Sequence, residues 1–260
     1  MTATSEILYN CSDAIDEGGG KMNRFTKEQA PECASCRFKA VCFYDKLGQE
    51  AQKAWNRMKA SRKFSDDETI YNEAQHPQGV YIVCKGRAKV FCTDSRGQQM
   101  ITWIRHPGET FGHIALFAES DYFSNTRAMG DTILSFMDSK TLEQFLDEHP
   151  KTYRLFLQKV ASELHGMQMK LKDTAYKPAR AKVAKTLINS ISYKTRNTDK
   201  PAIYGLKRTE IAEITGLALE TVVRTLADLE KRGVIKRETK SIKILDYQTL
   251  SRVADPHAKK

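Results

Sequence analysis

The feature that most constrains the fold is a stretch near the C-terminus, residues 207–246, where two short helical patterns flank a glycine. Thr209 can accept a backbone hydrogen bond at the start of the first helix, and Gly216 suits the positive φ of a sharp turn. Three apolar residues give this helix a face to bury: Ile211, Ala212 and Ile214. Helix, glycine turn and second helix in this order predict a helix-turn-helix unit.

The second helix of this unit is predicted to begin near Leu219. Apolar side chains recur along it at positions i, i+4 and i+7, which places them on one buried face: Val222, Leu226 and Leu229. Its first exposed turns carry four side chains that can enter a DNA major groove, namely Glu220, Thr221, Val223 and Arg224. A plain helical hairpin could share this spacing, but it would need no basic hairpin after it.

Such a basic hairpin follows Gly233. Runs at residues 234–238 and 241–245, joined by a two-residue turn, predict the paired strands of a winged helix-turn-helix. Four cations lie on this wing and can touch phosphates: Lys236, Arg237, Lys240 and Lys243. The predicted DNA-contacting residues outside the second helix are Lys207, Arg208, Thr209 and Lys240.

The distribution of charge points to a polyanion partner. The chain has a net charge of +10 and a pI near 9.2. Residues 177–260 hold 19 Lys and Arg against 9 Asp and Glu, so this part carries the whole excess and the rest of the chain is balanced. A positive excess confined to the predicted helix-turn-helix favours double-stranded DNA as the partner.

A chain of 260 residues is long enough for two domains, each with its own core. We expect a cytoplasmic protein without membrane association, because no stretch approaches about 18 apolar residues and no basic segment precedes an apolar run at the N-terminus. An enzyme is not expected, since the chain lacks the G-x-S-x-G, P-loop and H-E-x-x-H motifs.

The N-terminal region carries a candidate metal site. Residues 1–30 are polar and predict a flexible arm. Directly after them, Cys33, Cys36 and Cys42 form a C-x2-C-x5-C array, and in a reducing cytoplasm such cysteines are metal ligands or free thiols rather than disulfides. The array favours an iron–sulfur cluster, because closely spaced thiolates can reach one cluster. A zinc site completed elsewhere and unligated, packed thiols are the alternatives.

Short strands of period two extend over residues 64–137, after a predicted helix at residues 44–62. Glycines punctuate them at the roughly 8–12-residue spacing of an antiparallel sandwich or barrel, so we predict a β-roll, or jelly roll, in a sensor domain of residues 31–149. One turn is predicted at Lys85-Gly86. The cysteines of the flanking strands, Cys84 and Cys92, fall on the apolar phase and are predicted to be buried as small hydrophobic residues.

A long helix is predicted from about residue 150 to residue 174, in a dimerisation segment of residues 150–176. Its apolar side chains recur at spacings of four and three and form a seam: Tyr153, Leu157, Val160, Leu164, Met167 and Leu171. The seam could pack on the roll, but a homodimer is favoured, because helix-turn-helix proteins usually bind two half-sites about one DNA turn apart. Lys177-Pro178 predicts a hinge before a helix at residues 179–193, which opens the DNA-binding domain of residues 177–260.

These parts, in this order, resemble one family. A cysteine-bearing segment, a β-roll, a long helix and a C-terminal winged helix are similar to the Crp/Fnr transcription regulators over residues 33–253. The most specific pieces are LALETVVRTL in the second helix and ECASCRFKAVC, whose spacing resembles the oxygen-sensing Fnr branch. The resemblance implies an α+β fold with a cyclic-nucleotide-binding-like roll, a homodimer that acts with RNA polymerase, and regulation by oxygen, nitric oxide or redox state.

The resemblance also implies a 4Fe-4S cluster held by Cys33, Cys36 and Cys42 and by a fourth cysteine in the roll. This chain departs from the pattern there, because Ser135 stands at the matching position. The candidates for a fourth ligand are Cys84, Cys92, Cys11, Asp131 and Asp138, or no protein group.

The cyclic-nucleotide branch of the family has Gly-Glu-Leu and then Arg-Ser around the phosphate. This chain has Gly112-His113-Ile114 and Phe123-Ser124 at the matching positions, which argues against cyclic AMP. His113 could serve as a haem ligand. The alternative function is therefore a regulator of this family that uses a haem, an organic effector or no effector.

Overall fold

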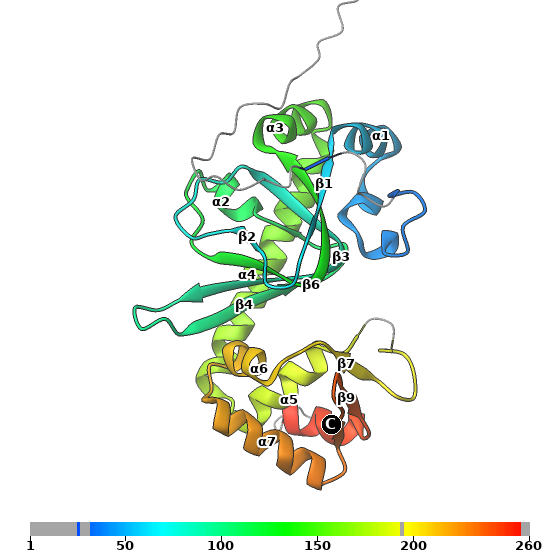
Figure 1. Ribbon diagram of the computed structural model, residues 1–260. Coiled ribbons are helices and arrows are strands. Elements are labelled where there is room, and N and C mark those ends of the chain that lie inside the picture. The colour runs from blue at the N-terminus through cyan, green and yellow to red at the C-terminus, as the bar shows by residue number, and fades with distance from the viewer. Residues whose placement is uncertain (1–24, 27–31, 193–194, 256–260) are drawn as a thin grey trace, which may run out of the picture.

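The fold has two parts joined by one long helix (Figure 1). The computed structural model describes residues 25–26, 32–192 and 195–255. A β-roll with short helices forms the first part, and a smaller, mostly helical part with a three-stranded sheet forms the second. The predicted α+β class, with a β-roll and a C-terminal helix-turn-helix, is confirmed.

The roll is one antiparallel sheet. Its strands are β1 (Ala60–Phe64), β2 (Thr69–Tyr71), β3 (Gly79–Thr93), β4 (Gln99–Arg105), β5 (Thr110–Phe111) and β6 (Asn125–Asp138). Their hydrogen-bonded order is β1-β6-β3-β4, while β2 pairs with β6 and β5 pairs with β3. Inward side chains such as Phe64, Phe111 and Leu134 are almost fully buried. The period-two pattern predicts these strands because alternate residues of a strand share one face.

Strand β3 differs from the prediction. The sequence predicts a turn at Lys85-Gly86, but β3 continues through both residues and pairs with β6 on either side of them. The register shifts between Val83 and Lys85 and again between Lys85 and Arg87, so the glycine marks β-bulges and not a turn. Gly86 has a φ of +79°, and a Cβ there would clash with Thr132, so this bend requires glycine.

Short helical elements surround the roll: η1 (Lys39–Val41), η2 (Phe43–Lys46), α1 (Gln49–Met58), α2 (His113–Phe117) and α3 (Ser139–Glu148). The helix predicted at residues 44–62 is therefore shorter, because a 3-10 turn precedes it and β1 already begins at Ala60. Helix α1 buries Ala51, Ala54 and Trp55.

Phe25 and Thr26 are the described part of the segment predicted as a flexible arm. Thr26 exchanges two backbone hydrogen bonds of 2.7 Å with Ser61 of β1. The Phe25 ring centroid lies 4.8 Å from that of Phe136. These two residues are thus attached to the roll, while the rest of the predicted arm, with Cys11, lies outside the described residues and its flexibility stays a prediction.

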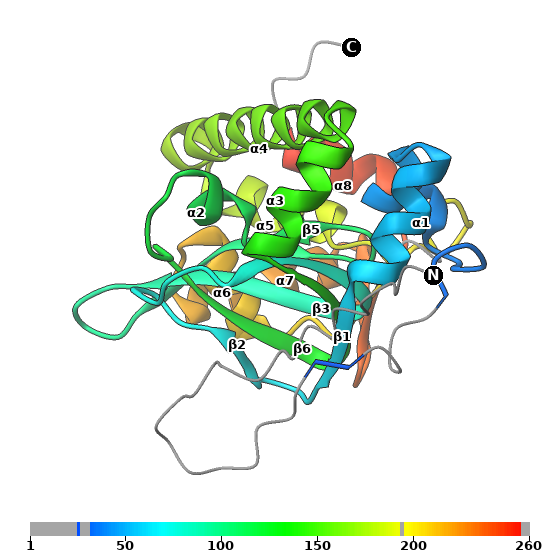
Figure 2. The same ribbon diagram turned by 90° about the horizontal axis from the view of Figure 1, so that it is seen from above.

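Helix α4 (Lys151–Tyr176) runs along one side of the roll and leads to the second part (Figure 2). It buries Thr152, Phe156 and Glu163. The predicted apolar seam lies on a different face, with Leu157 69% exposed and Leu171 72% exposed. Most of the seam therefore faces solvent, while Met167 also lines a cavity of the roll.

Lys177 and Pro178 separate α4 from α5, as predicted. The elements of the second part are α5 (Ala179–Asn189), β7 (Ala202–Tyr204), α6 (Arg208–Thr215), α7 (Leu219–Lys231), β8 (Ile235–Arg237), β9 (Ser241–Ile244) and α8 (Tyr247–Ala254). Helix α5 ends at Asn189, before the predicted residue 193, which lies outside the described residues. No helix in the described ranges is long and apolar enough to cross a membrane.

A buried ion cluster fixes α4 to the roll. Glu163 of α4 is 5% exposed, and its Oε1 accepts a 2.6 Å hydrogen bond from Arg105 of β4. Its Oε2 lies 3.4 Å from Nε2 of the fully buried His113, and Lys159 lies 3.0 Å from Oε1. Burial alone would raise the pKa of Glu163, but the contacts with His113 and Arg105 outweigh burial and hold this pKa well below its ordinary value.

We predict that Glu163→Gln lowers the free energy of unfolding by about 3–5 kcal/mol at neutral pH, because it leaves the Arg105 cation buried without its anion. The lowered pKa has a second consequence. The ionised Glu163 carboxylate adds to the free energy of unfolding. This contribution is fully present above the ordinary pKa of 4.5 and is lost as the pH falls below it, because the unfolded chain then takes up the proton first. Urea unfolding of wild type and variant from neutral to acidic pH measures both effects. Glu143→Gln on the exposed face of α3 is the control, and an equal loss there would contradict the prediction.

Candidate functional site

Helix α7 presents the side chains that the sequence predicts for a DNA groove. It begins at Leu219, as predicted, and the three residues predicted to face the core are fully buried: Val222, Leu226 and Leu229. Glu220 and Arg224 are exposed, and Thr221 and Val223 are partly exposed. The helix therefore keeps its apolar face in the core and offers its polar N-terminal turns to a partner. Contact of these four residues with DNA stays a prediction.

Helix α6, the first helix of the unit, begins differently from the prediction. Its N-cap is Lys207, and the Glu210 carboxylate accepts a 2.7 Å hydrogen bond from the Lys207 backbone N–H. Thr209 is thus not the capping residue, and it lies exposed in the first turn. Gly216 ends the helix with a φ of +64°, as its predicted role in the turn requires.

The wing has less free positive charge than its sequence indicates. Arg237 forms a 2.6 Å ion pair with Glu230 of α7, and Lys243 forms one of 2.6 Å with Glu238. Lys236 and Lys240 are exposed. Strand β7 pairs with β9 and makes the wing sheet three-stranded, in the order β7-β9-β8. The sequence analysis missed β7, because a three-residue strand has too few positions to show a period.

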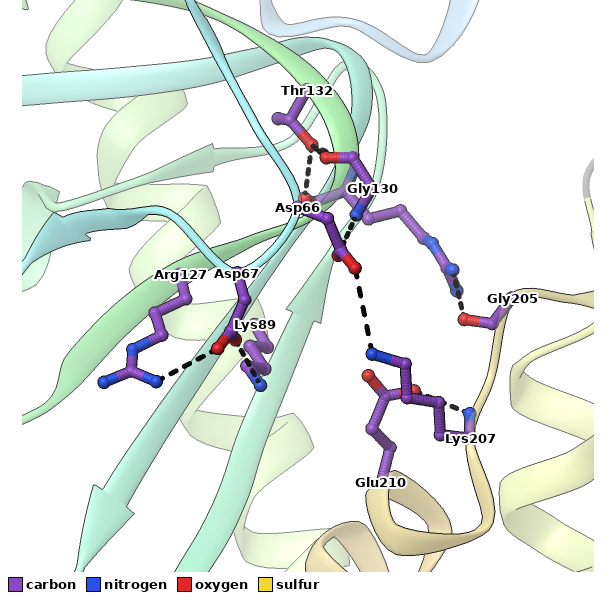
Figure 3. Close-up of polar contacts among 10 residues, drawn as sticks. Asp66, Asp67, Lys89, Arg127, Gly130, Thr132, Gly205, Lys207 and Glu210 are labelled. Carbon is purple, nitrogen blue, oxygen red and sulfur yellow. Dashed lines mark hydrogen bonds and ion pairs between the residues drawn. The ribbon is translucent and has the colours of Figure 1, made fainter.

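The roll and the helix-turn-helix part are held together by polar contacts (Figure 3). Lys207, a predicted DNA contact, lies 3.8 Å from Asp66 in the loop after β1. Asp66 is itself fixed by a 2.7 Å hydrogen bond from the Gly130 N–H. Arg87 of β3 donates a 2.7 Å hydrogen bond to the Gly205 carbonyl. We call this set, Asp66, Arg87, Gly205 and Lys207, the interdomain latch.

The two halves of the latch differ in strength. Both side chains of the Lys207 pair are more than 60% exposed, and such surface pairs contribute about 0–1 kcal/mol. A hydrogen bond from a charged group, such as that of Arg87, contributes about 1.5–3 kcal/mol. The backbone of Arg87 is held in turn by Thr132, whose hydroxyl donates to its carbonyl at 2.9 Å. The Arg87 hydrogen bond is therefore the stronger half of the latch, and Lys207 lies toward the roll.

The cysteines of the N-terminal array lie together, as their spacing predicts. Cys33, Cys36 and Cys42 line one cavity of about 20 Å³, and Cys84 of β3 and Ser135 of β6 line it too. We call it the cysteine cavity. Its volume is about that of one water molecule, so it is closed around its own side chains. The sequence predicts Cys84 as a buried hydrophobic residue and also as one of several candidates for a fourth ligand. It does not single Cys84 out, because nothing in the local sequence shows which residues lie across a sheet.

The chemistry of the cysteine cavity suits a soft metal. Four thiols are the donor set of iron–sulfur and zinc sites. Burial, together with smaller contributions from the charges of the other cavity cysteines, raises the pKa of the Cys42 thiol to about 11 and that of the Cys84 thiol to about 12. A bound metal would displace those protons. The donors do not yet converge, because within the described residues no three His, Cys, Asp or Glu side chains are arranged to hold a metal ion.

A second cavity lies in the roll, and Gly112, Ile114 and Ser124 are among the residues that line it. Its volume is about 120 Å³, whereas pockets for drug-sized ligands measure about 300–1,000 Å³. His113 and Arg105 line it, but Glu163 contacts both of them. His113 is fully buried in the roll, with its Nε2 3.4 Å from Oε2 of Glu163. This cavity is smaller than a typical ligand pocket, and Glu163 pairs with two of the side chains that line it.

Two family descriptions match this arrangement. A cyclic nucleotide-binding domain matches residues 61–149, and a Crp-like helix-turn-helix domain matches residues 181–253. Together they cover more than half of the chain. The chain belongs to the Crp/Fnr family. It is a DNA-binding transcription regulator and, as predicted, not an enzyme.

Relatives of this Crp/Fnr regulator match it over most of its length. It is 26% identical to a CRP-like cAMP-activated global transcriptional regulator of Mycobacterium tuberculosis, over 74% of this chain and 86% of that protein. It is 24% identical to the transcriptional activator protein anr of Pseudomonas aeruginosa, over 85% of this chain and 92% of that protein. FixK2 from Bradyrhizobium japonicum shares the fold, with a TM-score of 0.68 and 24% identity over 75% of this chain and 96% of that one.

We predict that Arg224→Ala weakens binding to a duplex selected from a random pool by about 1–3 kcal/mol and relaxes one base position. Arg224 can donate to guanine O6 and N7, while Glu220 can accept from cytosine N4 and Val223 can contact a thymine methyl. Lys240→Ala on the wing is the matched control. It should weaken all sequences alike and reduce the salt slope by about one. Competition binding with single-base variants measures both, and a uniform loss in Arg224→Ala would make that residue a phosphate contact.

We predict that Arg87→Ala strengthens DNA binding in the absence of a signal by up to about tenfold, because it removes the stronger half of the latch and frees Lys207. Arg127→Ala is the control. It also removes one positive charge, but Arg127 pairs with Asp67 of the roll and makes no contact in the latch. Titration of both variants with one duplex measures the effect. Equal affinity of Arg87→Ala and wild type would show that the latch does not restrain the DNA-binding part.

Proposed function

We propose that this regulator responds to oxygen, nitric oxide or redox state through an iron–sulfur cluster of the 4Fe-4S type bound at the cysteine cavity. The observation that carries the proposal is the gathering of Cys33, Cys36 and Cys42 on one cavity beside the roll. Bound there, a cluster would supply a centre whose charge and integrity change with oxidants. The three cysteines would hold it by their thiolates.

The cysteine segment has a direct mechanical route to α4. Phe43, the residue after Cys42, is buried with its ring 5.6 Å from Trp55 of α1 and 4.8 Å from Phe156 of α4. Tightly packed rings transmit a shift because a core has no free volume to absorb it. A change in the position of Cys42 would thus reach α4, and through Lys177-Pro178 the DNA-binding part.

The regulator would act as a homodimer, as regulators of this family do. Five of the six seam residues are at least 38% exposed in the single chain: Tyr153, Leu157, Leu164, Met167 and Leu171. Burying such side chains fully stabilises by about 1.5–3 kcal/mol each, so a second copy of α4 is the partner that suits this face. A two-fold axis along the seam would place two α7 helices for two half-sites. We place the protein in the cytoplasm, with RNA polymerase as its further partner.

Protein purified without air is expected to contain iron and sulfide and to bind its selected duplex with an affinity that changes by a factor of about 5–150 after exposure to air. Iron and sulfide analysis, the visible absorption spectrum and DNA titration measure this. Sedimentation at micromolar concentration should give a dimer before and after exposure, because the seam contains no charged residue that would oppose association.

Cys33→Ala is the control for this experiment and should lack both the iron and the response to air. Absence of iron from the anaerobic wild type would overturn the proposal. Iron with no change in DNA affinity would separate the metal from regulation and contradict the sensing role.

A further inference from the structure

The bulge in β3 places one residue beyond the ladder with β6. Val83 pairs with Leu134 and Lys85 pairs with Ile133, so Cys84 is the extra residue between them. An extra residue in a bulge leaves the regular alternation and can aim its side chain elsewhere. The neighbouring pair is Ile82 with Ser135, so Cys84 and Ser135 lie at the same end of the cysteine cavity.

A glycine joins the two walls of this cavity. The Gly108 N–H donates a 2.8 Å hydrogen bond to Val83 O, and its carbonyl accepts one of 3.4 Å from Phe43 N. Gly108 has a φ of +91°, and a Cβ there would stand 3.0 Å from Cys42 Cα. The absence of a side chain thus lets the backbones next to Cys84 and Cys42 approach each other.

We propose that Cys84 is the fourth sulfur ligand of the metal centre, in place of the roll residue at position 135. This inference rests on the proposed function. The remaining described candidates lie elsewhere: the Cys92 thiol contacts Phe123 O at 3.6 Å, the Asp138 carboxylate caps α3 through the Thr141 N–H, and Asp131 is exposed. Cys84 is the described candidate that shares a cavity with the array.

The position of Lys59 is consistent with a negatively charged metal centre in the cysteine cavity. The Lys59 residue is 8% exposed, and its ammonium lies 2.6 Å from Cys33 Sγ. A buried ammonium is costly unless an anion compensates it. Four metal-bound thiolates supply more negative charge than three, and Lys59 stands where it offsets part of that charge. The sequence does not indicate this role of Lys59, because a lysine before a strand is ordinarily solvated.

The test compares Cys84→Ala with Cys92→Ala, which removes a thiol from the same strand outside the cavity. Both variants are purified without air as full-length protein, and iron, sulfide and the visible spectrum are measured per chain. In competition with a chelator, Cys84→Ala should bind iron at least about tenfold more weakly than wild type. Loss of a residue that only hydrogen-bonds to a metal ligand already lowers metal affinity by about 10–100-fold, and loss of a ligand should lower it at least as much. Cys92→Ala should match wild type.

A second variant distinguishes the loss of a ligand from a general loss of the fold. Ser135→Cys in the Cys84→Ala background returns a thiol to the same end of the cavity and should restore iron and sulfide. Iron retention by Cys84→Ala equal to wild type would overturn the inference, and so would an equal loss in Cys92→Ala or failure of Ser135→Cys to restore iron. If wild type itself holds no iron, the proposed function fails first.

Discussion

The structure depends on a helix whose faces have different environments. Toward the roll, α4 buries Phe156 and a carboxylate, Glu163, that is stable there only because Arg105 and His113 compensate it. A buried ion cluster of this kind allows one position of the helix, since sliding it would separate the charges in a medium of low dielectric constant. On another face, the apolar seam stays in solvent. The same anchoring that fixes α4 on the roll therefore determines which side chains remain for a second chain.

The candidate sites meet this helix from both ends. The cysteine segment reaches it through the ring contact of Phe43 with Phe156, and the DNA-binding part follows it after Lys177-Pro178. The interdomain latch connects the same two parts by another route, through Arg87 and Gly205. The roll and the DNA-binding part are thus connected both along the chain, through α4 and Lys177-Pro178, and across space, through the latch.

Fewer cations of the DNA-binding part are free to bind phosphate than its composition indicates. The excess of positive charge lies in residues 177–260, but several of those cations are engaged. Arg237 pairs with Glu230 of α7, Lys243 pairs with Glu238 of the wing, and Lys207 pairs with Asp66 of the roll. Paired cations contribute less to phosphate binding, since their own carboxylates compete with the phosphate. Lys207 differs from these two, because its partner Asp66 belongs to the roll and not to the DNA-binding part.

The sequence by itself determined what depends on neighbours along the chain. The buried face of α7, the left-handed Gly216 and the apolar seam follow from periodicity and backbone preference, and the structure has all three. The grouping of Cys33, Cys36 and Cys42 is likewise local. Only the tertiary structure decided that Cys84 lies in a bulge beside Ser135, that Lys59 lies beside Cys33 and that Lys207 faces Asp66. These contacts join residues up to 141 positions apart, as with Asp66 and Lys207, and one sequence carries no periodic signal for a pairing across a sheet or between two domains.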